Sequence, residues 1–208
     1  MPRLASRGRP RRGRPEDTRR RLIVAAAAEF NRVGYHATDS NRLARVAGYA
    51  PGTFYKHFPD KRTLFLAVYE DWVTREWAAV GAIVRTGGAP ARVARAVVAQ
   101  VMALHRRWRG LRASLRALVV ADAGARVFYR TQRRRQLELL AALRGTGKTA
   151  AADRLEDAML LYTLERVCDA AADGELGDLG LGAPPVVTWL EARVAARIPR
   201  LRSTRARQ

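Results

Sequence analysis

One short polar segment, Gly52–His57, holds the side chains whose types and spacing best fit a binding chemistry. Its first two residues are slim enough to approach another surface closely. Tyr55, Lys56 and His57 carry hydrogen-bond donors, and in a helix Phe54 can point inward as an anchor. Slim, donor-rich helix faces read phosphates and base edges in the DNA major groove. The segment therefore indicates double-stranded DNA as the partner.

Other chemistries find little support in the sequence. His36 and His105 are isolated, and no set of His, Cys or carboxylate residues has metal-ligand spacing. There is no nucleophile motif, phosphate loop or paired-acid signature. Cys168 is the one cysteine and lies in an apolar stretch, which predicts a small buried side chain. We therefore expect no enzyme activity, no metal ion and no cofactor.

The donor-rich segment lies in a pattern of short helices. A first helix is expected from near Asp17 or Thr18 until Gly34, which can adopt the left-handed conformation beyond a helix end. A short helix, capped by Thr38 or Asp39, closes at Ala47-Gly48. A second runs from Pro51 to about His57. Two short helices around a glycine turn predict a helix-turn-helix.

The remaining sequence predicts more helices and no strands, so the fold class is all-α. The helices are expected at about 60–85, 90–107, 111–124, 126–143, 153–172 and 184–198. We divide the chain into a disordered basic arm (1–15), a three-helix DNA-binding domain with the helix-turn-helix (16–62), a larger helical domain (63–198) and a basic tail (199–208).

Charge supports a polyanionic partner. The 208 residues carry a formal net charge of +20, which favours polyanions near the surface. Residues 149–198 are the exception, since their four basic and nine acidic side chains give a net charge of −5. The N-terminus lacks the apolar core of a secretory signal, and no apolar run approaches the roughly 20 residues of a membrane helix. We expect a cytoplasmic protein that does not associate with membranes.

Residues 18–69 resemble the TetR/AcrR family of transcriptional regulators. The resemblance rests on Gly34-Tyr35-His36-Ala37-Thr38, Leu43-Ala44, Ala47-Gly48-Tyr49-Ala50-Pro51-Gly52-Thr53-Phe54-Tyr55-Lys56-His57-Phe58, Lys61 and Leu64-Phe65. The chain departs from the family pattern at Ser40, usually valine-like, and at Ala50, where a Ser or Thr usually caps the recognition helix. A lost cap of this kind commonly costs about 1 kcal/mol.

The resemblance implies DNA contacts residue by residue. Thr53, Tyr55 and His57 are expected to touch the DNA backbone or bases, and Lys61 a phosphate. The further DNA-binding positions are Thr38, Asn41, Arg42, Pro51, Gly52 and Lys56.

The resemblance also implies that the larger domain binds a small-molecule inducer and forms a homodimer. Aromatic residues that could line the pocket, by this inference, are Trp72, Trp108, Phe128, Tyr129 and Tyr162. Dimerisation is expected through the helices near 153–172 and 184–198, with Leu190 and Val194 on the apolar stripe.

The unit Arg-Gly-Arg-Pro occurs twice in the arm. A slim, basic segment can lay arginines into a narrow minor groove, which favours Arg9 and Arg14 as further DNA contacts. The other interpretation is a solubilising tail.

The leading hypothesis is a dimeric repressor that binds a palindromic operator and is released by a ligand. The alternatives are an architectural DNA-binding protein without an inducer, and an enzyme with an appended DNA-binding domain. The sequence leaves repression or activation open.

Overall fold

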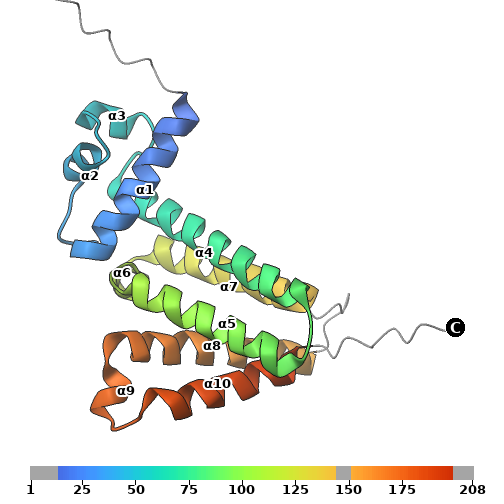
Figure 1. Cartoon of the computed structure of the whole chain (residues 1–208). Coiled ribbons are helices and arrows are strands. Elements are labelled where there is room, and N and C mark those ends of the chain that lie inside the picture. The colour runs from blue at the N-terminus through green and yellow to red at the C-terminus, as the bar shows by residue number, and fades with distance from the viewer. Residues whose placement is uncertain (1–13, 144–150, 199–208) are drawn as a thin grey trace, which may run out of the picture.

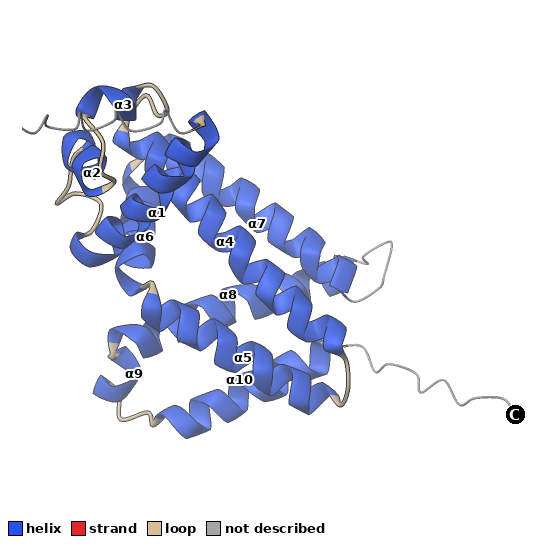
Figure 2. Cartoon of the chain, turned by 45° about the horizontal axis from the view of Figure 1, so that its top comes forward, coloured by secondary structure: helices blue, strands red, loops and turns tan. Residues whose placement is uncertain are grey.

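The computed structural model describes residues 14–143 and 151–198, which are helical with no strand (Figures 1 and 2). The helices lie at α1 Pro15–Val33, α2 Ser40–Val46, α3 Pro51–Tyr55, α4 Lys61–Thr86, α5 Pro90–Arg107, α6 Arg109–Ala121, α7 Ala123–Leu143, α8 Ala151–Asp173, α9 Glu175–Asp178 and α10 Ala183–Arg197. The all-α prediction is confirmed. In Figure 1, α1, α2 and α3 form one end of the molecule, and α5, α8, α9 and α10 the other.

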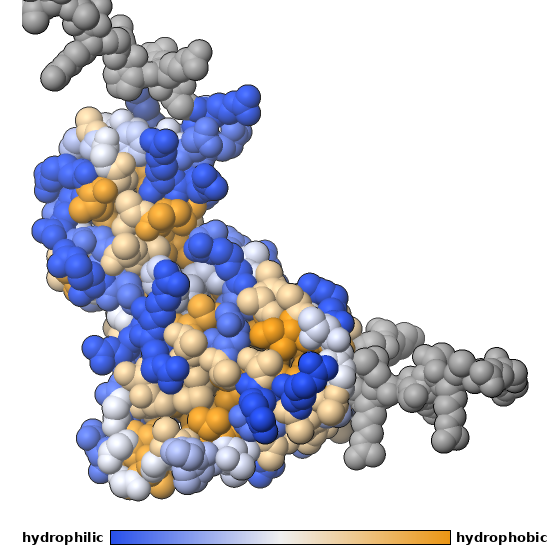
Figure 3. All heavy atoms as spheres, in the orientation of Figure 1, coloured by the Kyte–Doolittle hydropathy of each residue, from blue (hydrophilic) through white to orange (hydrophobic). Residues whose placement is uncertain are grey.

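The surface mixes hydrophilic residues with apolar patches, and one patch lies at the lower end of Figure 3, near α9. Several large apolar side chains between α8 and α10 are more than 40 % exposed: Leu155, Met159, Tyr162, Leu179, Leu181 and Trp189. These side chains are available to contact another surface.

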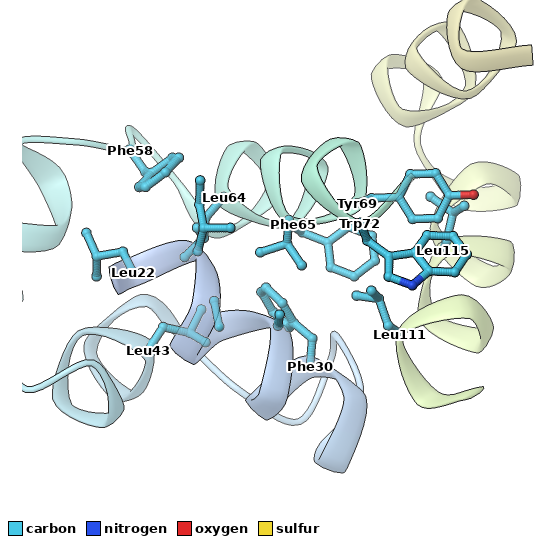
Figure 4. Close-up of a cluster of buried hydrophobic side chains, with 14 of the residues drawn as sticks. Leu22, Phe30, Leu43, Phe58, Leu64, Phe65, Tyr69, Trp72, Leu111 and Leu115 are labelled. Atoms are coloured by element: carbon cyan, nitrogen blue, oxygen red, sulfur yellow. The ribbon is translucent and has the colours of Figure 1, made fainter. Parts of the chain in front are cut away.

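The helix-turn-helix end is built on a core that continues into the larger domain. Leu22 and Phe30 of α1 pack with Leu43 of α2, and the same cluster includes Leu64 of α4 and Leu111 of α6 (Figure 4). The boundary predicted after residue 62 falls in the first turn of α4. Because the apolar core crosses that boundary, α4 and α6 hold the two parts of the chain together.

A second core lies between α5, α8 and α10 and corrects the predicted dimer stripe. Leu190 and Val194 are 0 % and 6 % exposed and belong to this core. The apolar spacing on α10 correctly indicated a buried helix face. That face packs against helices of the same chain and not against a second copy. Cys168 is buried here, as predicted, and burial raises the pKa of its thiol to about 12.

Several helix ends differ from the predicted bounds: α6 ends at Ala121 rather than 124, and α7 begins at Ala123 rather than 126. α1 begins at Pro15 with Arg14 as N-cap, rather than near Asp17 or Thr18, because proline suits the first helical position. The short α9 arises within a glycine-rich stretch predicted as a loop. Asp39 caps α2 by accepting a hydrogen bond from the Arg42 amide, at 2.8 Å.

A set of close contacts, which we term the α1–α6 bracket, joins the end of α1 to the start of α6. Asn31 donates to a carbonyl at the end of α5 (2.9 Å) and accepts from the Leu111 amide (3.1 Å). The Ser114 hydroxyl accepts from the Tyr35 amide, at 3.0 Å. A Cβ at Gly110 would lie 2.0 Å from the Asn31 carbonyl oxygen. Only glycine permits this approach of the two backbones.

Candidate DNA interface and ligand cavity

The turn between α2 and α3 sets the position of the recognition helix. Gly48 has φ of +80°, a conformation that favours glycine. The Tyr49 amide donates to the Ala44 carbonyl, at 2.9 Å. Ala50 stands at the N-cap of α3 with no side-chain hydrogen bond. The tight turn and the missing cap both agree with the sequence analysis.

The recognition helix α3 buries one residue and presents the others. Phe54 is fully buried and packs near Phe58, with ring centroids 6.1 Å apart. The predicted contacts Pro51, Gly52, Tyr55 and Lys56 are exposed, and Thr53 and His57 are partly exposed. The structure therefore leaves the polar groups of α3 accessible, and their contacts with DNA stay predictions.

The two outer residues of α2 that were predicted to contact DNA differ in their side-chain partners. Asn41 is exposed. Arg42 is also exposed, but its guanidinium donates to the buried carboxylate of Glu29 on α1, at 2.5 Å. Arg42 thus holds α2 against α1 as well as facing outward.

One of the predicted DNA contacts, Lys61, has a structural role in the loop before α2. The Lys61 ammonium donates to the carbonyls of Tyr35 (2.9 Å) and Thr38 (2.8 Å), and it lies 4.2 Å from the Tyr35 ring centroid. Burial lowers the pKa of Lys61. The phosphate contact of Lys61 stays a prediction beside this role.

Thr38 corrects the sequence analysis. Its side chain is 6 % exposed and its hydroxyl oxygen is buried without a hydrogen-bond partner. In this structure the hydroxyl cannot reach DNA.

Of the two arginines predicted in the arm, Arg9 lies outside the described residues. Arg14 is exposed at the N-cap of α1, where its carbonyl accepts from the Asp17 amide at 3.0 Å. Its minor-groove contact stays a prediction.

The larger domain encloses a cavity of about 110 Å³ between α4, α5, α6, α7, α8 and α10. Most of its wall is apolar: Trp77, Val80, Val84, Val97, Val101, Leu140, Leu143, Leu160, Leu161, Leu164, Val194 and Ile198. The polar lining residues are Glu76, His105, Arg112, Arg133, Gln136, Asp157, Glu165 and Arg197.

None of the five aromatic residues predicted as ligand contacts lines this cavity. Trp72 belongs to the first core, and Trp108 and Phe128 pack against it. Tyr129 and Tyr162 line a separate hollow of about 280 Å³ together with Arg112 and Arg116. These five residues therefore lie outside this cavity, and their role as ligand contacts stays a prediction.

Charged and titratable residues at apolar positions of the helices are the sequence feature that could have predicted the cavity. In the sequence His105 is isolated, and Arg133 lies in a basic run of a type that is usually a solvated helix face. In the structure the two residues are 3 % and 7 % exposed. Buried charged residues require partners, so their presence marks a polar site inside the domain.

The arginines of the cavity are matched by acids. Arg112 donates to Asp169 (2.5 and 3.0 Å) and to Glu165 (2.5 Å). Arg133 pairs with Glu165 and donates to Gln136, at 2.9 Å. Burial alone would raise the pKa of Asp169, but hydrogen bonds from His105 and Arg112 hold it below its usual range. Asp169 and Glu165 thus each pair with a buried arginine, although the buried Nε of Arg133 has no hydrogen-bond partner in the described residues.

Glu76 differs from the other acids of the cavity. Its side chain is 10 % exposed, and within the described ranges it has no hydrogen-bond partner. The Nε2 of His105 lies 3.7 Å from its Oε1. Burial raises the pKa of Glu76 to about 7, although Arg112 and Arg133 act to lower it.

Within residues 14–143 and 151–198, no group of three or more His, Cys, Asp or Glu residues could hold a metal ion. No helix in these ranges is both long and apolar enough to span a membrane.

Sequence comparisons identify the N-terminal part of the chain. Residues 22–68 match the profile described as bacterial regulatory proteins, tetR family. The chain is 38 % identical over 82 residues to the transcriptional activator FasR of Mycolicibacterium smegmatis, and 32 % over 59 residues to the regulator YdgC of Bacillus subtilis. These segments cover 38 % and 28 % of this chain, and 37 % and 30 % of the two relatives.

Solved structures match over most of the chain. A TetR-family regulator from Rhodococcus sp. has a TM-score of 0.68 at 16 % identity, covering 88 % of this chain and all of the other. The fatty acid degradation regulator FadR from Bacillus halodurans has a TM-score of 0.60 at 17 % identity, covering 86 % and 94 %. At these identities the likeness concerns the fold.

Proposed function

We propose that this chain, a member of the TetR family, is a DNA-binding transcription regulator that acts as a homodimer and responds to a small molecule. The observation that carries the proposal is the helix-turn-helix of α2 and α3, with the polar residues of α3 accessible on a buried Phe54 anchor. Two such helices in a dimer would enter successive major grooves of a palindromic site. Operator binding would place the action of the protein in the cytoplasm.

Tyr55→Ala tests the recognition helix. Tyr55 is 55 % exposed, so the variant should melt close to the wild type. A lost hydrogen bond to a charged phosphate is worth about 1.5–3 kcal/mol, so affinity should fall tenfold or more. The measurement is a mobility shift on DNA that the wild-type protein has selected from a random pool.

Lys61→Ala is the matched comparison. It should weaken DNA binding and also lower the melting temperature, because the carbonyls of Tyr35 and Thr38 lose their donor. If Tyr55→Ala binds the selected DNA as the wild type does, α3 is not the reading element.

We further propose that the dimer forms through the outer faces of α8 and α10. Met159 and Trp189 are 57 % and 46 % exposed, and they replace the buried Leu190 and Val194 as contact residues. Residues 149–198 carry a net charge of −5 in a chain of +20. Two copies can therefore meet there without the repulsion of two basic surfaces.

A Met159→Glu/Trp189→Glu variant should be monomeric at micromolar concentration, because like charges would face one another in the dimer. Light scattering coupled to size exclusion gives the mass. Val127→Glu is the control, since Val127 is 63 % exposed on α7, outside the proposed interface. A monomeric wild-type protein, or a double variant that remains dimeric, contradicts this interface.

The cavity favours a ligand-responsive regulator over an architectural DNA-binding protein. It lies beside α4 and α6, which also contribute to the core under α1. A ligand that prefers one arrangement of these helices would shift the population of DNA-binding states. We propose repression relieved by ligand. A promoter–reporter assay separates it from activation, the role stated in the name of the M. smegmatis relative.

A further inference from the structure

The charges of the cavity are balanced except at Glu76. Arg112 and Arg133 pair with Asp169 and Glu165, and Asp169 also pairs with Arg116, which has a second acid partner in Asp173. Outside this set, Arg197 pairs with Asp157, at 2.8 Å. The carboxyl of Glu76 is the remaining acid in the cavity wall, and no guanidinium of the described chain donates to it. A buried acid without a partner destabilises the empty protein.

The neighbour of Glu76 offers a second acceptor. The Nδ1 of His105 lies 2.9 Å from Asp169 Oδ1, so the Nδ1 hydrogen is donated to that carboxylate. Burial lowers the pKa of His105, which keeps the ring neutral. Its Nε2 then presents a lone pair toward Glu76, 3.7 Å from Oε1. Two acceptors thus face one another, and a donor between them would satisfy both.

The apolar part of the cavity wall favours a ligand with an apolar body. Val80 and Val84 continue the wall along α4 from Glu76, and Val97 and Val101 face the cavity from α5. Leu160 and Leu164 do so from α8. A ligand that fits would bring an apolar body to these side chains and a single donor group to the polar end.

We propose that the cavity binds an apolar amine in its protonated form, with the ammonium group donating to the Glu76 carboxylate and to His105 Nε2. The ammonium supplies the missing positive charge as well as donors for both acceptors. A carboxylate ligand at the same place would add a third acceptor to the pair formed by Glu76 and His105. This assignment rests on the proposed function, since it names the ligand class of a regulator's cavity.

The test compares three probes that share one chain: n-octylamine, octanoic acid and 1-octanol. Calorimetric titration of the full-length protein at pH 8, without DNA, should show octylammonium binding at least tenfold tighter than the other two probes. Glu76→Gln keeps the shape of the side chain and should abolish this preference. Glu70→Gln makes the same change at an exposed position of α4, outside the cavity, and should leave the preference intact.

The pH profile of the wild type is an independent readout, valid even where a variant folds poorly. The ligand needs ionised Glu76, whose pKa is about 7. The titratable and charged groups that face it from α5, α6, α7 and α8 are His105, Arg112, Arg133, Asp169 and Glu165, and the hydrogen bonds of Asp169 hold its pKa far below this range. Octylammonium affinity should therefore rise as pH increases through 7, approaching tenfold per unit below it, and Glu76→Gln should bind with no such slope.

Three results overturn the assignment: tighter binding of octanoate, no octylammonium binding up to millimolar concentration, or a preference unchanged in Glu76→Gln. Operator binding is measured separately. If octylammonium binds through Glu76 but never alters the mobility shift, the ligand class stands and the proposed regulation fails.

Discussion

Gly110→Ala is expected to destabilise the protein and to separate α1 from α6. The new Cβ would lie 2.0 Å from the Asn31 carbonyl oxygen and 2.9 Å from its carbon, both backbone atoms that cannot turn away. Overpacking costs about 1–3 kcal/mol. The hydrogen bonds of Asn31 to the α5–α6 junction would add about 1 kcal/mol each. Alanine regains at most about 1 kcal/mol through its better helix propensity.

The net loss should therefore be about 2–4 kcal/mol, which lowers the melting temperature of a chain of this size by roughly 5–15 °C. Thermal denaturation followed by circular dichroism measures it. Gly177→Ala serves as control, because a Cβ there meets no atom within 4 Å. Equal melting of the two variants would show that the α1–α6 bracket contributes little to stability.

Arg112→Met is the second substitution with a large expected effect. Arg112 is 3 % exposed and donates to Asp169 and Glu165. Its removal leaves buried carboxylates short of a partner, and breaking a buried pair in this way costs about 3–5 kcal/mol. Arg166→Met, which breaks an exposed pair with Glu175, should cost less than about 1 kcal/mol.

Denaturant unfolding of both variants gives the two free energies. The expectation fails if Arg112→Met is as stable as Arg166→Met.

The DNA-binding end was predictable because local sequence determines it. Gly48, Asp39 and Pro51 each act through their own backbone or through neighbours a few residues away, so their roles can be read from the chain. The exposure of Tyr55 and Lys56 follows from one buried aromatic, Phe54, on a short helix.

The cavity was not predictable in the same way. Asp169 forms hydrogen bonds with His105 and with Arg112, which lie 64 and 57 residues before it in the sequence. Their helical spacing fixes a face, but not which helix covers it. The same ambiguity affected Leu190, where an apolar stripe suited an inner core and a dimer equally well. The sequence could not decide which aromatic residues contact a ligand, because ring size favours core packing and ligand contact alike.

α4 joins the two ends of the molecule as a single helix. Lys61 begins it under the helix-turn-helix, and Glu76 faces the cavity from the same helix. At 1.5 Å per residue these positions lie about 22 Å apart, so a tilt of about 5° at the cavity would move the other end by about 2 Å. Hydrogen bonds to DNA tolerate only a few tenths of an ångström before they weaken. α4 is therefore long enough to act as a lever, turning a slight rearrangement around a bound ligand into a displacement that operator contacts would not survive.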